Sequence, residues 1–230
     1  KNMVCINDGG SGEKETRNSY IIYTQYGSWI GQLLFGESVG KFARQANYYA
    51  SMEEENGASV TMVQTNTVGE FIDAWNNLPD QADSIYIFSH GNGMSLIFEN
   101  GKGISATGFD RNDQRIHAIG ELDRKQIGSL YLMSCNSGHT DLFDAAGINA
   151  AAAFAEMGTI GNVYAYDGSV SFGTPIIRVF SGNYSARLSN NQDSYPAVYT
   201  NFGINMPAGS PKGLFRYYWD GITVRYEKEG

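Results

Sequence analysis

The chain has 230 residues, 42% of them hydrophobic, which is enough to bury a sizeable core, most simply as one domain with additions. The net charge of −8 argues against nucleic acid or an anionic membrane surface as the main partner. No apolar run approaches the roughly 20 residues of a membrane-spanning helix, so no membrane partner is predicted.

The first part of the chain predicts alternating strands and helices after a glycine-rich start. Residues 1–19 are rich in glycine and charge and predict a flexible arm. Regular elements follow in the order strand, helix, strand, helix, at residues 20–23, 33–52, 58–63 and 67–78. Asn56-Gly57 ends the first helix, and Thr67 with Glu70 three residues later forms a capping box for the second.

Two apolar runs of strand type each end in a chemically active side chain. Residues 84–91 end in His90-Gly91, and residues 129–135 end in Cys135. Such runs are typical of buried central strands, and ligands bind at the carboxyl ends of strands in an open parallel sheet. We therefore expect His90 and Cys135 to lie close together as a pair for nucleophilic catalysis. The backbone N–H groups of Gly91 and Cys135 are candidates for an oxyanion hole.

The surrounding segments complete the predicted α/β arrangement, in which a mostly parallel sheet carries helices on its faces. The further expected elements are a hairpin, a short helix, a helix, a strand and a terminal hairpin, at residues 94–108, 116–126, 149–157, 162–166 and 214–226. The first hairpin turns at Asn100-Gly101 and follows His90 directly, so we expect it to form one wall of a site. Beyond Ser169 the periodicity fades, and Tyr, Asn, Pro and Gly dominate.

The blocks Phe88-Ser89-His90-Gly91 and Met133-Ser134-Cys135 together resemble the signature of the caspase-like (clan CD) cysteine peptidases. In that family one apolar strand ends in His-Gly and another ends in Ser-Cys or Ala-Cys. The resemblance covers roughly residues 58–167, and its style is similar to clostripain- or gingipain-type enzymes and to toxin self-processing domains. It implies Cys135 as the nucleophile, His90 as its partner, the oxyanion hole at the amides of Gly91 and Cys135, and a caspase-like α/β/α sandwich.

The resemblance also implies a substrate preference. Asp167 follows the strand after the Cys135 strand, and clostripain-like and separase-like relatives use an acidic residue in this general place to bind Arg or Lys. Asp167 is therefore the candidate substrate-binding residue for cleavage after basic residues. The alternative is that Asp167-Gly168 is only a turn. Asp141 and Asp144 are weaker candidates and are interpreted as residues that begin or cap a helix.

Other interpretations of the same residues were weighed. His139 lies four residues after Cys135, too close along the chain for a pair at two strand ends, and a zinc site with Cys135 and His90 lacks a second cysteine. An α/β-hydrolase is excluded because its nucleophile turn needs a small residue where Met133 stands. The rival outside the enzymes is a catalytically silent caspase-like module that binds a partner or acts in surface interaction.

The sequence therefore predicts a flexible arm at residues 1–19 and a single caspase-like domain at 20–230, with a core of about 20–168 and a Tyr/Gly-rich C-terminal extension of about 169–230. The predicted function is that of a cysteine endopeptidase, a hydrolase that acts on a protein or peptide substrate without cofactor or metal. The 28 glycines and 15 tyrosines are typical of exported bacterial proteins, so a secreted or cell-surface location is predicted. The start at Lys1 is interpreted as that of a mature or excised fragment.

Overall fold

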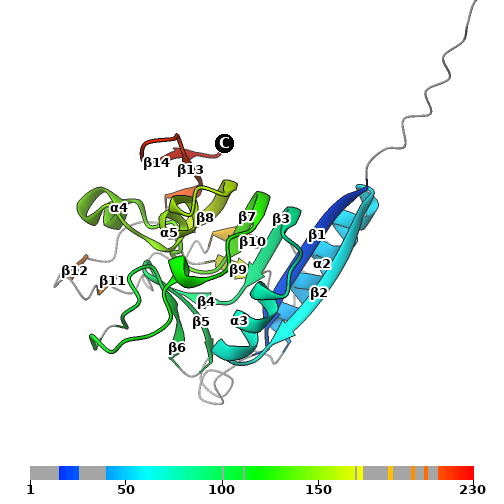
Figure 1. Ribbon diagram of the computed structural model, residues 1–230, viewed down its shortest axis with the longest axis horizontal. Helices are drawn as coiled ribbons and strands as arrows, with labels where there is room; N and C mark the ends of the chain where they lie inside the picture. The colour runs from blue at the N-terminus through cyan, green and yellow to red at the C-terminus, as the bar shows by residue number, and fades with distance from the viewer. Residues whose placement is uncertain are drawn as a thin grey trace, which may run out of the picture.

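The protein is a mixed α/β structure built on one large, mostly parallel sheet (Figure 1). The computed structural model describes residues 16–25, 40–99, 101–110, 112–168, 170–172, 186–188, 198–199, 205–206 and 212–230. The strands of the large sheet are β1 (Arg17–Thr24), β2 (Ala58–Thr65), β3 (Gln81–Phe88), β7 (Gln126–Met133), β8 (Ile160–Asp167), β13 (Gly213–Trp219) and β14 (Val224–Lys228). Their order is β14-β13-β8-β7-β3-β1-β2. Strands β2, β1, β3, β7 and β8 run parallel, and β13 and β14 add an antiparallel edge.

Helices cover both faces of this sheet. The helices are α2 (Lys41–Glu55), α3 (Val68–Asn76), α4 (Thr140–Ala146) and α5 (Ala150–Glu156), with a 3-10 turn η1 (Ile119–Glu121). On one face, α2 packs Phe42 and Ala46 into a cluster with Tyr86 and Phe88 of β3. On the other face, α3 and α5 belong to the cluster that contains Ile85 and Ile87. Residues 84–88 of β3 are all buried because both of its faces are covered.

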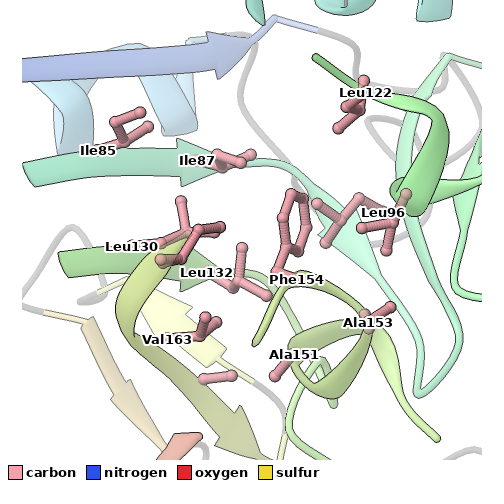
Figure 2. Packing of buried hydrophobic residues seen from close by; sticks show 14 of the residues in the cluster. Ile85, Ile87, Leu96, Leu122, Leu130, Leu132, Ala151, Ala153, Phe154 and Val163 are labelled. Atoms are coloured by element: carbon pink, nitrogen blue, oxygen red, sulfur yellow. The ribbon is translucent and has the colours of Figure 1, made fainter. Parts of the chain in front are cut away.

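The larger core cluster lies between the central strands and the α3/α5 side. Phe154 of α5 is completely buried, and Figure 2 shows its ring between Ile87, Leu96 and Leu132. Ala151 and Ala153 let α5 approach β8 and β13 closely, because an alanine adds only one methyl group to the helix surface. The N-terminus of α5 lies against the loop that follows Cys135, where the Ala151 N–H donates to the carbonyl of Ser137.

Shorter strands form small sheets beside the large one. β4 (His90–Gly91), β5 (Ser95–Glu99) and β6 (Lys102–Ser105) make a three-stranded antiparallel sheet. In Figure 1 it lies just beyond the end of β3. The pairs β9 (Val170–Phe172) with β10 (Ala186–Leu188) and β11 (Val198–Tyr199) with β12 (Asn205–Met206) are two further antiparallel ladders.

Most of the expected elements are present, with shifted ends. β1 begins at Arg17, three residues before the expected strand, and residues 1–15 of the expected arm, which include Cys5, lie outside the described residues. The expected helix at 33–52 is described from Lys41 onward and ends at Glu55, with Asn56 as its C-cap. Thr67 caps α3 by accepting a hydrogen bond from the Glu70 N–H at 3.1 Å. The Glu70 carboxylate reaches back to the N–H of Asn66 instead of Thr67, at 2.6 Å, so the capping box is displaced by one residue.

The prediction of a short helix at 116–126 is wrong. Only the turn η1 forms there, and Gln126 already belongs to β7. Tertiary contacts override the helical pattern, because the ammonium group of the buried Lys125 donates to the carbonyls of Asn76 and Leu78 at the end of α3, at 3.0 and 2.8 Å. These bonds fix the chain before β7 in an extended path.

The terminal hairpin is present, and it belongs to the central sheet. β13 pairs with β8 along five residues, from Gly213 opposite Asp167 to Tyr217 opposite Val163. A boundary near residue 168 therefore divides strands that share one sheet. Among the described residues, no helix is both long enough and apolar enough to cross a membrane.

Candidate active site

The register of β3 and β7 brings the histidine and the cysteine to one place. The two strands are parallel neighbours, and Phe88 lies opposite Met133 at their carboxyl ends. His90 and Cys135 each follow two residues later. A Cβ atom added to Gly91 would lie 3.0 Å from the carbonyl oxygen of Cys135. The His90-Gly91 segment is thus in direct contact with the residues that carry the thiol.

His90 is held by two different elements. Its backbone pairs with Ile97 in the small antiparallel sheet, so the expected hairpin does form one wall of the site. Its imidazole packs edge-on against the ring of Phe42, with ring centroids 5.1 Å apart and planes at 78°. Phe42 lies in the first turn of α2, which begins at the same edge of the sheet. His90 is partly exposed.

Cys135 is partly exposed, and the backbone of β9 lies beside its sulfur. The N–H of Val170 in β9 donates to the Cys135 Sγ, with an N···S distance of 3.3 Å. The carbonyl oxygen of Val170 is 4.0 Å from the same sulfur. Methionine, aromatic and valine side chains of the α2-side cluster lie around the thiol. The sulfur therefore lies between the backbone of Val170 in β9 and this apolar cluster.

The loop after Cys135 turns sharply and is tied to β8. Asn136 has a φ of 57°, in the left-handed region that Asn tolerates better than most residues. Its N–H donates to the carbonyl of Gly168 at 2.9 Å, and the N–H of Gly138 donates to Tyr166 at 3.1 Å. Because the Asn136 N–H is used in this way, it is not a free donor for an oxyanion.

Two buried residues that the sequence analysis did not single out support this loop. The Asn149 side chain donates to the carbonyl of His139 at 3.1 Å and to the Tyr217 hydroxyl at 3.0 Å. The Tyr217 hydroxyl in turn donates to the carbonyl of Gly138 at 3.0 Å. Burial raises the pKa of Tyr217, so the phenol stays a hydrogen-bond donor. The position of Asn149 before a helix signals a cap, but no local pattern predicts its bond to His139.

Asp167 is 2% exposed and lies against the start of α4. Its Oδ2 accepts hydrogen bonds from the Thr140 N–H at 3.0 Å and from the Thr140 hydroxyl at 2.7 Å. The ammonium group of Lys212 lies 3.9 Å from the same oxygen and also forms an ion pair with Asp141. These contacts give Asp167 a structural role in this corner. Its selection of a basic substrate residue stays a prediction.

His139 is the N-cap residue of α4. Its Nδ1 accepts a hydrogen bond from the Leu142 N–H at 3.2 Å. Burial lowers the pKa of His139, and the nearby carboxylates of Asp167 and Asp141 oppose this shift. The neutral imidazole fits the cap, because a proton on Nδ1 would remove the acceptor. Asp144 accepts a hydrogen bond from the Tyr226 hydroxyl at 3.0 Å, and Asp141 lies in the first turn of α4.

Within the described residues, three buried polar atoms without a hydrogen-bond partner lie at the same edge of the sheet. The hydroxyls of Ser89 and Ser134 and the Oδ1 of Asn136 are such atoms. Each of these residues is next in sequence to His90 or Cys135. Unpaired buried polar groups cost free energy and are uncommon in folded proteins. All three lie next to the histidine or the cysteine at the carboxyl ends of β3 and β7.

A cavity of about 750 Å³ lies elsewhere, at the opposite ends of the same strands. It is lined by the amino ends of β1, β3, β7 and β8, and among its side chains are Gln81, Gln126 and Trp219. None of the predicted site residues contributes to it. Within the described part of the chain, no group of three or more His, Cys, Asp or Glu side chains is arranged to hold a metal ion.

No family model matches the sequence, and no curated protein matches it either.

Proposed function

We propose that this protein is a cysteine endopeptidase with a caspase-like fold, in which Cys135 and His90 form the catalytic dyad. The observation that carries the proposal is the direct contact between the His90-Gly91 and Ser134-Cys135 segments at the carboxyl ends of adjacent parallel strands. Helices on both faces of a mostly parallel sheet support the caspase-like α/β/α arrangement. A further support is that both side chains remain partly exposed, as a site for a macromolecular substrate requires.

The proposed chemistry has two steps. The Cys135 thiolate attacks the peptide carbonyl carbon and forms a C–S bond, while His90 donates a proton to the departing amine as the C–N bond breaks. Water then attacks the thioester carbonyl carbon while His90 takes a proton from it, the C–S bond breaks, and the carboxylic acid product leaves with Cys135 restored as a thiolate and His90 protonated. The amides of Gly91 and Cys135 would donate hydrogen bonds to the negatively charged oxygen in both steps.

The proposed substrate is a protein or peptide cut after Arg or Lys. The support for this is the carboxylate corner at the start of α4, where Asp141 and Asp167 both lie near the Lys212 ammonium group. This corner already binds a lysine side chain of the chain itself. A basic side chain of a substrate would find the same complementary charges if Lys212 moved aside.

Covalent labelling tests the dyad directly. The Cys5→Ser variant, which leaves Cys135 as the only thiol, is incubated with peptidyl acyloxymethyl ketones that end in Arg, Lys, Leu or Asp. Peptide mapping then locates the adduct. The expected result is labelling of Cys135 by the Arg and Lys reagents that is lost in His90→Ala. Cys135→Ala is the matched control.

The other outcomes separate the parts of the proposal. Labelling of Cys135 only by the Leu or Asp reagent would retain the dyad and refute the basic specificity. Absence of any labelling in folded protein would refute the peptidase and favour a catalytically silent binding module.

A further inference from the structure

The strand β9 lies beside the sulfur of Cys135. Val170 is 7% exposed and begins β9, and its backbone pairs with Leu188 of β10. Its N–H donates to the Cys135 Sγ at 3.3 Å, and its carbonyl oxygen lies 4.0 Å from the same atom. The N–H and C=O of one residue in an extended strand point to the same side. The edge of β9 at Val170 therefore faces the thiol.

The N···S and O···S distances favour different protonation states of the sulfur. A thiol can donate a weak hydrogen bond to a carbonyl, but 4.0 Å is long for that bond. An N–H donor at 3.3 Å is complementary to a sulfur that carries negative charge. Hydrogen bonds to the charged form of a titratable group favour that form. The contact thus stabilises the thiolate over the thiol, and it does so without any side chain.

We propose that the main-chain N–H of Val170 is a catalytic group that stabilises the thiolate form of Cys135. In the proposed reaction His90 donates a proton to the leaving amine, while the Val170 N–H acts on the sulfur itself. This inference rests on the proposed function only in naming Cys135 as the nucleophile. As the C–S bond forms, the sulfur loses its negative charge, and the hydrogen bond from the Val170 N–H to the sulfur weakens. This hydrogen bond regains its strength when the C–S bond breaks and the thiolate is released.

The test measures the rate at which iodoacetamide alkylates Cys135 as a function of pH, in the Cys5→Ser background. In one variant the valine at position 170 is replaced by its α-hydroxy acid, which exchanges the N–H for an ester oxygen and keeps the side chain. Val170→Pro removes the same N–H by a different route, and Val170→Ala keeps it as the control. Circular dichroism confirms that each variant is folded.

Loss of the N–H is expected to slow alkylation at slightly acidic pH by about tenfold, with rates that converge at high pH where every form is ionised. The Val170→Ala profile should match the parent protein. An unchanged profile in both N–H-deficient variants would overturn the proposal.

The result is distinguishable from failure of the peptidase proposal. Alkylation by iodoacetamide requires neither a peptide nor an oxyanion hole, so a shifted profile would support the Val170 assignment even if no peptidyl reagent reacted. Conversely, peptidyl labelling with an unshifted alkylation profile would retain the peptidase and remove Val170 from its mechanism.

Discussion

The contact at Gly91 offers the sharpest test of the site geometry. A Cβ at this position would meet three atoms of the cysteine strand: the Cys135 carbonyl oxygen at 3.0 Å, the Ser134 Cβ at 3.0 Å and the Ser134 Oγ at 3.2 Å. Two of these atoms belong to backbone or to a Cβ and cannot rotate away. Gly91→Ala must therefore push the His90 segment and the Cys135 segment apart.

The size of the effect follows from these distances. Non-bonded carbon atoms prefer about 3.5–4.0 Å, so the added methyl group needs a separation of about 0.5 Å between the segments. Overpacking of this kind lowers the free energy of unfolding by about 1–3 kcal/mol. Since a 1 Å misplacement of catalytic groups costs about 100-fold in rate, we expect about a tenfold loss of labelling rate at Cys135.

The assay compares Gly91→Ala with Gly120→Ala, in which the added Cβ has no atom within 4 Å. Urea unfolding gives the change in stability, and time-resolved intact mass gives the rate of labelling by the peptidyl ketone that reacts best. Gly120→Ala should match the parent protein in both measurements. If Gly91→Ala also matched it, the two strand ends would not be in contact and the geometric basis of the dyad would be wrong.

Three further predictions concern the support of the nucleophile loop. Asp167→Ala removes the acceptor of two hydrogen bonds from Thr140 and should lower the free energy of unfolding by about 2–4 kcal/mol. Asp141→Ala breaks a half-exposed ion pair and should lower it by less than about 1 kcal/mol. Equal losses of stability in urea unfolding would contradict these assigned roles. Because burial lowers the pKa of His139 below its ordinary value of 6.5, the unfolded chain takes up the proton first. Its contribution to stability is therefore present above about pH 6.5 and is lost as pH falls toward the folded pKa. His139→Asn should cap α4 without titrating, so a stability difference from the parent that stays constant from about pH 7 to pH 5 would rule this out. Tyr217→Phe leaves buried partners unpaired and should lower stability by about 1–3 kcal/mol in thermal unfolding; an unchanged melting temperature would show that the loop does not depend on this hydroxyl.

Local patterns were enough to predict the strands that carry the site. The runs ending in His90 and Cys135 are apolar because both faces of β3 and β7 are covered, and this property is visible in the sequence. The Thr67 cap and the turn at Gly101 were also predictable, since each depends on residues a few positions apart. Whether His90 and Cys135 act on a peptide stays a prediction.

Long-range contacts explain what could not be predicted. Lys125 reaches carbonyls 47 and 49 residues earlier, so a segment with a helical pattern becomes extended. Val170 meets the thiol across 35 residues, and its contribution is a main-chain N–H that every residue except proline has. Asp167 is an acidic residue at a strand end in the sequence, and only the folded chain reveals that Thr140 and Lys212 occupy it.

The position of β13 also has a consequence for the order of events during folding. Tyr217 bonds to Gly138 across 79 residues, and Lys212 bonds to Thr140 across 72. Contacts at such separation close late, because the chain must first lose the entropy of a long loop. The thiol strand can pair early with β3, while the loop behind it becomes rigid only when β13 docks. During synthesis the loop after Cys135 thus reaches its final geometry only after residues 212–217 have left the ribosome.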